Sequence, residues 1–269
     1  IIYGPLPPRG PADAMDIADG QFLGMVGINA WVFAGLSLAA ATTAFIAAIV
    51  GTAGGLLLIA VMAFVFPPAL LIPIHTVVQL GAAGSMAISR WRYLMRETVL
   101  PFTIGTVIGA AIGGQIFVSL PENLLLLALG VSILALAWVP KIARFGPERG
   151  RFAFMGFVVT FLGIFISATG TLLASFTVAI APDRRNHIAT LGALMSIVHI
   201  AKLAAFILLG VSFGNYVPLI AAMIVTSFIG TWIGKYALDI VPERLFRIAI
   251  QTMLTLMALR LIWVALEGF

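Results

Sequence analysis

The chain has no cysteine and very few charged residues. The absence of cysteine excludes disulfides, thiolate nucleophiles and cysteine-ligated metals. Charged residues make up 9% of the 269 positions, whereas soluble domains carry about 25%. The ten acidic residues and three histidines are scattered, so they predict no metal site. No paired acids, activated nucleophile or nucleotide-binding motif is visible, and we therefore expect a protein that is not an enzyme and that binds no cofactor.

Long apolar runs occupy most of the chain instead. Hydrophobic residues account for 62% of it, and the mean hydropathy is +1.15. Residues 21–89 contain no Asp, Glu, Lys or Arg, and a helix needs only about 20 apolar residues to cross a bilayer. The runs do not alternate apolar and polar residues, which excludes a β-barrel. The sequence predicts an all-α polytopic membrane protein, and the pI of about 10.1 reflects basic cytoplasmic loops rather than nucleic-acid binding.

Prolines, glycines and charge clusters divide the apolar sequence into helical segments. We expect helices at residues 28–50, 52–66, 69–89, 97–119 and 122–140, and then at 152–167, 170–181, 185–209, 215–238 and 243–265. We interpret residues 1–20 as a disordered leader or a cloning remnant. The basic stretch 141–151 is predicted to be a cytoplasmic linker between a first membrane repeat, 21–140, and a second, 152–269.

The two halves share a pattern of residues 121 positions apart. Gly109, Gly113 and Pro121-Glu122 recur as Gly230, Gly234 and Pro242-Glu243. Loop 90–96 is basic but its counterpart 210–217 is not, and loop 240–247 is basic but its counterpart 119–123 is not. Because basic loops face the cytoplasm, matched loops lie on opposite sides of the membrane. We therefore predict two inverted repeats of about five helical segments each in the bacterial inner membrane, with both termini on the non-cytoplasmic side.

Each half is expected to open with a broken helix or helical hairpin. Breaks rich in glycine and threonine interrupt apolar runs at 51–55 and 167–171, and the segments that follow cover only about 22 Å and 18 Å. Non-helical backbone at membrane depth is tolerated only against protein or a water-filled cavity. Free N–H groups and a helix dipole there suit a small anion near the midplane. The alternative is tight helix packing, which we predict for Gly105, Gly109 and Gly113, spaced four apart.

Polar side chains on the following helices are the second group of candidates. His75 and Gln79 share a helix face about 10 Å and 16 Å from the start of their helix. Ser196 lies about 16 Å along the matching helix and shares a face with His199, and Lys202 follows at about 25 Å. Each histidine is either a packed, hydrogen-bonded residue or a proton carrier. Lys202 either extends to the outer interface or attracts the substrate.

The pattern of glycines, prolines and charged residues between the apolar segments resembles that of the sulfite exporter TauE/SafE-like family. The resemblance covers residues from about 30 to 265 and is carried by Val50-Gly-Thr-Ala-Gly-Gly-Leu-Leu57, Pro67-Pro68, Arg90-Trp-Arg92, Pro101 and the stretch 109–122. Thr52 and Ala53 interrupt the longer glycine run that is usual at the first break. The resemblance implies a membrane transporter, often an exporter, of sulfite, organosulfonates and related small anions.

These observations together give the hypothesis of a secondary transporter for a small anion held between the two breaks. Energy is expected to come from an ion or substrate gradient, with a proton or sodium as the candidate coupling ion, and rocking of one repeat against the other alternates access. The alternative is a channel-like anion pore in which the same breaks form a filter. The candidate substrate-binding residues are Thr52, Gly54, Gly55, Gln79, Ser167, Thr169, Gly170, Thr171 and Ser196, with His75, His199 and Lys202 for proton coupling or substrate attraction.

Overall fold

The computed structural model describes residues 22–50, 54–138, 149–166, 169–234 and 243–267, and this part of the chain is helical and contains no strand. The first half forms α2 (Ala30–Val50), α3 (Gly54–Met62), α4 (Pro68–Ser89), α5 (Val99–Ser119) and α6 (Glu122–Trp138). The second half forms α7 (Arg149–Ile166), α8 (Gly170–Ile180), α9 (Arg184–Leu208), α10 (Val217–Gly234) and α11 (Glu243–Glu267). The predicted helical segments are confirmed to within a few residues at most ends.

Two helix ends differ from the prediction. Helix α3 ends at Met62 rather than at 66, because the next four residues form turns ahead of Pro67 and Pro68. A residue that precedes proline is disfavoured in the helical region, so the helix ends before this pair. Helix α7 begins at Arg149, so the last part of the predicted linker is helical.

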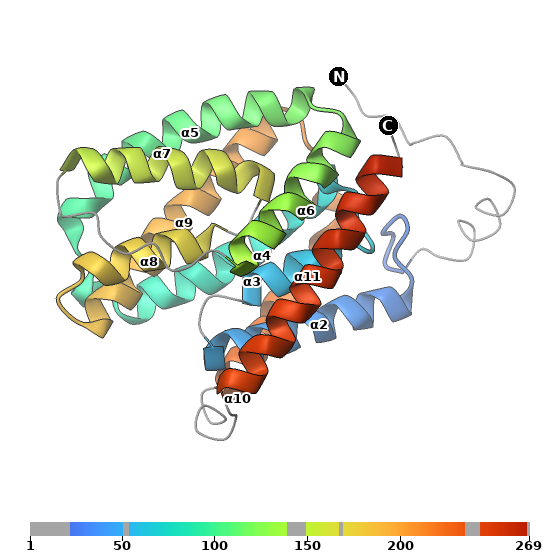
Figure 1. Cartoon of the computed structure of the whole chain (residues 1–269), viewed down its shortest axis with the longest axis horizontal. Helices are drawn as coiled ribbons and strands as arrows, with labels where there is room; N and C mark the ends of the chain where they lie inside the picture. The colour runs from blue at the N-terminus through green and yellow to red at the C-terminus, as the bar shows by residue number, and fades with distance from the viewer. Residues whose placement is uncertain (1–21, 51–53, 139–148, 167–168, 235–242, 268–269) are drawn as a thin grey trace, which may run out of the picture.

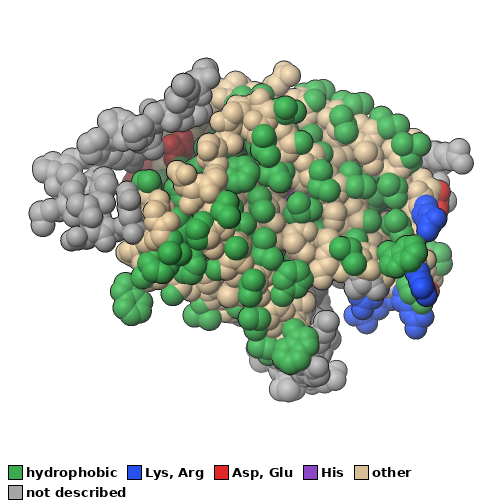
Figure 2. Space-filling model, turned by 180° about the vertical axis from the view of Figure 1, so that it is seen from behind, with side chains coloured by type: hydrophobic (Ala, Val, Ile, Leu, Met, Phe, Trp, Pro, Cys, Tyr) green, Lys and Arg blue, Asp and Glu red, His purple; other side chains and the backbone are tan. Residues whose placement is uncertain are grey.

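The described helices suit a membrane in length and surface. Five stretches are long and apolar enough to span it: 30–47, 68–88, 96–119, 184–208 and 214–234. Apolar side chains cover much of the outer face, and the Lys and Arg side chains visible there gather at one end (Figure 2). This surface lacks the polar cover of a soluble protein, and the prediction of an all-α polytopic membrane protein is confirmed.

Helices of one half pack mainly on helices of the other (Figure 1). Helix α5 packs on α7 as α2 packs on α10, and α5 packs on α9 as α4 packs on α10. The central pairs are α4 with α9 and α6 with α11. If α2 to α6 correspond to α7 to α11, exchanging the halves maps each of these pairs onto another or onto itself. This reciprocity supports the two-repeat interpretation, while the inversion across a membrane stays a prediction.

Glycines provide the close contact at two of these interfaces. A Cβ atom on Gly109 of α5 would lie 2.6 Å from the carbonyl oxygen of Phe157 on α7, and Gly105 lies against the backbone of the same helix. In the second half, Gly230 of α10 lies against the carbonyl of Ala41 on α2. The prediction that the glycines spaced four apart are packing residues is confirmed.

Candidate functional site

The first break lies against two polar side chains of α4. A Cβ atom on Gly55, at the start of α3, would lie 2.6 Å from Nε2 of Gln79. His75 donates from Nε2 to the carbonyl oxygen of Gly55 over 3.1 Å. Gly54 is pressed against the backbone carbonyl of Thr43 on α2, which leaves no room for a side chain. Glycine at both positions therefore lets the start of α3 fit between α2 and the polar face of α4.

The second break has a similar arrangement built from α7, α8 and α9. Thr169 precedes α8 and is 1% exposed, and its hydroxyl donates to the carbonyl of Val159 over 3.0 Å. A Cβ atom on Gly163 of α7 would lie 3.0 Å from Oγ1 of Thr169 and 3.8 Å from Cδ of Lys202. Lys202 of α9 therefore extends to the break. Oγ1 of Thr171 is buried there without a hydrogen-bond partner.

A cluster of three basic side chains connects the two breaks. His75 is 0% exposed, and His199 and Lys202 are 1% exposed. His75 contacts the carbonyl oxygen of Gly55 at the first break, and the stem of Lys202 lies beside Thr169 and Gly163 at the second. Helix α4 supplies one member and α9 supplies two, and these helices pack directly on each other. We call His75, His199 and Lys202 the basic cluster.

The basic cluster brings three groups that can carry a positive charge into the protein interior. Among the described residues whose burial is known, no Asp or Glu is buried, and Lys202 is the one lysine or arginine that is. Nδ1 of His199 is a buried polar atom with no hydrogen-bond partner. Burying a positive charge is costly unless an opposite charge or polar groups compensate. An anion bound beside Lys202 would add to the interactions that this side chain makes within the protein.

The structure brings most of the predicted residues together. Gly54, Gly55, His75 and Gln79 meet at the first break, and Thr169, Gly170, Thr171 and Lys202 meet at or beside the second, with His199 in the basic cluster. Thr52 and Ser167 lie outside the described residues. Because Lys202 is buried in protein, the interpretation that it extends along the lipid-facing surface to the interface is wrong.

Ser196 has a different position from the other candidates. Its hydroxyl donates to the carbonyl of Gly192 in its own helix over 2.8 Å. It lines an open groove between α4, α9 and α10. Sequence reasoning also missed Gly163, which makes room for Lys202, because a glycine within an apolar run carries no signal of what packs on it.

These features define a polytopic helical membrane protein with buried basic side chains beside two helix breaks. The model of the sulfite exporter TauE/SafE family matches residues 36–261, and the chain therefore belongs to this family. It is accordingly a membrane transporter rather than an enzyme, and its substrate is sulfite or a related small anion. No curated protein and no solved structure matches the chain.

Proposed function

We propose that this transporter exports sulfite or an organosulfonate across the bacterial inner membrane, by alternating access around the basic cluster. The observation that carries the proposal is the burial of Lys202, His75 and His199 on the paired helices α4 and α9. None of the Asp and Glu side chains whose burial is known is buried with them. A sulfite or sulfonate group presents three oxygen acceptors on one anionic centre. Ammonium, imidazole and hydroxyl groups are the donors that such acceptors require.

The helix breaks add backbone groups to the same site. The first N–H groups of a helix have no partner within that helix, and its N-terminus carries a partial positive charge. Helices α3 and α8 begin at Gly54 and Gly170, beside side chains of α4 and α9 respectively. In this proposal, the anion is held between the two helix starts and the basic cluster. Gln79 and Thr171 supply further polar contacts.

The burial of the cluster favours a carrier over a pore. The three basic side chains are at most 1% exposed, so solvent does not reach them in this arrangement. An open pore would keep its filter in contact with water, whereas a carrier passes through a state that is closed on both sides. The reciprocal packing of the two halves supplies two similar units that could rock against each other.

Proton coupling through His75 or His199 is a further part of the proposal, with sodium as the alternative coupling ion. His75 donates to a carbonyl oxygen at the first break. Nδ1 of His199 is without a partner and is available to a proton or to the anion. An imidazole that gained a proton would add a positive charge to the cluster, and this would raise its affinity for an anion.

The first test is ligand-dependent thermal stabilisation of the purified protein. Sulfite, sulfoacetate, taurine, thiosulfate and small carboxylates form the panel, and a ligand at 100 times its Kd stabilises by about 2.7 kcal/mol. We expect a rise in Tm with sulfite or a sulfonate, and the absence of a shift with every sulfur anion would refute the substrate class. Counterflow of a preloaded anion in proteoliposomes is expected for a carrier, whereas unitary currents would indicate a pore.

A further inference from the structure

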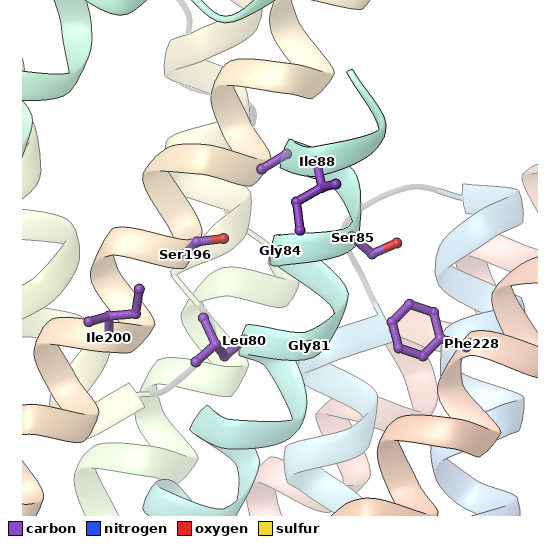
Figure 3. Close-up of a pocket in the computed structure, with 9 residues that line it drawn as sticks. Leu80, Gly81, Gly84, Ser85, Ile88, Ser196, Ile200 and Phe228 are labelled. Carbon is purple, nitrogen blue, oxygen red and sulfur yellow. The ribbon is translucent and has the colours of Figure 1, made fainter. Parts of the chain in front are cut away.

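An open groove of about 780 Å³ lies on the outer side of the α4–α9 pair, where α10 also borders it. In Figure 3, α4 runs along the middle of the groove, Ser196 and Ile200 come from α9, and Phe228 comes from α10. The lining is apolar apart from two serine hydroxyls: Leu80, Gly81, Gly84, Ser85, Ala87, Ile88, Ser196, Ile200 and Phe228. None of the three residues of the basic cluster lines the groove, so it is a separate feature.

The groove is open where Gly84 of α4 has no side chain. A Cβ atom on Gly84 would have no other atom within 4 Å, whereas one on Gly81 would contact Ile224 of α10 at 3.2 Å. From Leu80 to Ile88, the groove follows α4 for about 12 Å at 1.5 Å per residue. This length is a substantial part of one leaflet of a hydrocarbon core about 30 Å thick.

The groove ends where basic and aromatic residues begin. Ile88 is 76% exposed, and α4 ends one residue later. Arg90, Trp91 and Arg92 follow and are all exposed. The guanidinium of Arg92 lies 5.8 Å from the centroid of the Trp91 ring. An exposed tryptophan beside arginines is typical of the level of the lipid headgroups.

The start of α9 adds two more arginines to this end of the molecule. Arg184 and Arg185 are exposed, and Arg185 donates from Nη1 to the hydroxyl of Tyr93 over 3.0 Å. The amide of Asn186 donates to the carbonyl of Tyr93 over 2.9 Å. Figure 2 shows Lys and Arg side chains gathered at one end of a face on which many apolar side chains are exposed. The loop after α4 and the start of α9 therefore form one basic rim.

We propose that the groove holds one acyl chain of an anionic glycerophospholipid whose phosphate lies at the basic rim, beside Arg90 and Arg92. Lipid tails are as apolar as leucine, so the groove alone does not select a lipid in the bilayer. Selection comes from the headgroup, because each arginine near the membrane surface favours an anionic lipid about fivefold. The acyl chain in the groove fixes where the lipid binds, and the arginines of the basic rim select an anionic headgroup.

Native mass spectrometry of the full chain in detergent tests the proposal. The probes are phosphatidylglycerol, phosphatidylcholine with the same acyl chains, and glycerol 3-phosphate, which has the anionic group without chains. Gly84→Leu fills the groove, and Gly35→Leu is its matched control, because a Cβ atom on Gly35 of α2 also has no atom within 4 Å. Arg90→Gln with Arg92→Gln removes the rim charge beside the proposed phosphate, and Arg260→Gln, an exposed arginine over the Phe64 ring, controls for the loss of charge elsewhere.

We expect phosphatidylglycerol to bind on the order of tenfold more tightly than phosphatidylcholine, and glycerol 3-phosphate not to bind. Gly84→Leu should weaken the binding of phosphatidylglycerol several-fold, and Gly35→Leu should leave it unchanged. The double arginine variant should bring the two lipids to similar affinity. Equal binding of the two lipids by the wild type, or retention by Gly84→Leu, would overturn the proposal. The chain has no cysteine, so disulfide-linked dimers of a Gly84→Cys variant in membranes would also overturn it, by showing that a second copy covers the groove.

Discussion

Replacing Lys202 by methionine should remove most of the anion binding. The side chain is 1% exposed, and its stem lies against Gly163 beside the second break. Methionine keeps an unbranched apolar stem and removes the ammonium. The readout is the change in Tm that sulfite causes, compared between the wild type and the variant, so it does not depend on the stability of the variant without ligand.

The loss of binding can be sized from the type of contact removed. A hydrogen bond to a charged group contributes about 1.5–3 kcal/mol, so losing the one from Lys202 to the anion raises Kd about 10- to 150-fold. At a sulfite concentration 100 times the wild-type Kd, the wild type gains about 2.7 kcal/mol. A variant with a hundredfold higher Kd gains only about 0.4 kcal/mol at the same concentration. The ligand-dependent Tm shift should thus nearly disappear.

Thr160→Val is the matched control for the assay. Thr160 of α7 is fully buried and donates to Thr106 of α5 over 3.2 Å, at a helix interface outside the basic cluster. Its loss should cost about 1 kcal/mol of stability and leave the sulfite-dependent shift intact. Thr160→Val should therefore change stability without changing binding, whereas Lys202→Met should change binding. An unchanged sulfite shift and unchanged transport in Lys202→Met would show that the basic cluster is not the anion site.

Three further predictions concern packing, coupling and topology. Gly109→Leu should lower the free energy of unfolding by 1–3 kcal/mol or more, about the cost of overpacking, because its Cβ would press on the α7 backbone; Gly35→Leu should be near neutral in a thermal unfolding comparison. If protons are coupled through the cluster, His75→Ala combined with His199→Ala should abolish the pH dependence of uptake into proteoliposomes, and an unchanged pH profile would end that hypothesis. A cysteine introduced at Glu122 should react with a membrane-impermeant maleimide in intact spheroplasts, and labelling only after lysis would contradict the predicted orientation.

The positions of the helices could be predicted because residues at or next to each helix end mark where it begins or stops. Proline at the start of α4 cannot continue a preceding helix but fits the first turn of a new one. Glu122 stands at the first position of α6, where a carboxylate suits the helix dipole. The packing role of Gly109 was also predictable, since a repeat of glycines every four residues marks one face of one helix.

The neighbours of each polar side chain could not be predicted. In a membrane protein the interior and the lipid are both apolar, so hydrophobicity does not tell which face of a helix is buried. Ser196 and Lys202 show the difficulty, since both are polar residues on α9. They are six residues apart and therefore point about 120° away from each other around the helix. One lines the outer groove and the other reaches the second break.

The sequence by itself determined that the chain is an all-helical membrane protein and where its helices lie, and it predicted two repeats. Apolar run length, proline and glycine positions, and loop charge are local properties of the chain, so they need no partner to be interpreted. Only the tertiary structure decided that α4 packs on α9, which buries His75 beside the start of α3 and Lys202 beside the start of α8, with His199 also buried on α9. That meeting depends on how α4 and α9 cross, and the crossing is fixed by close packing of both helices with all their neighbours.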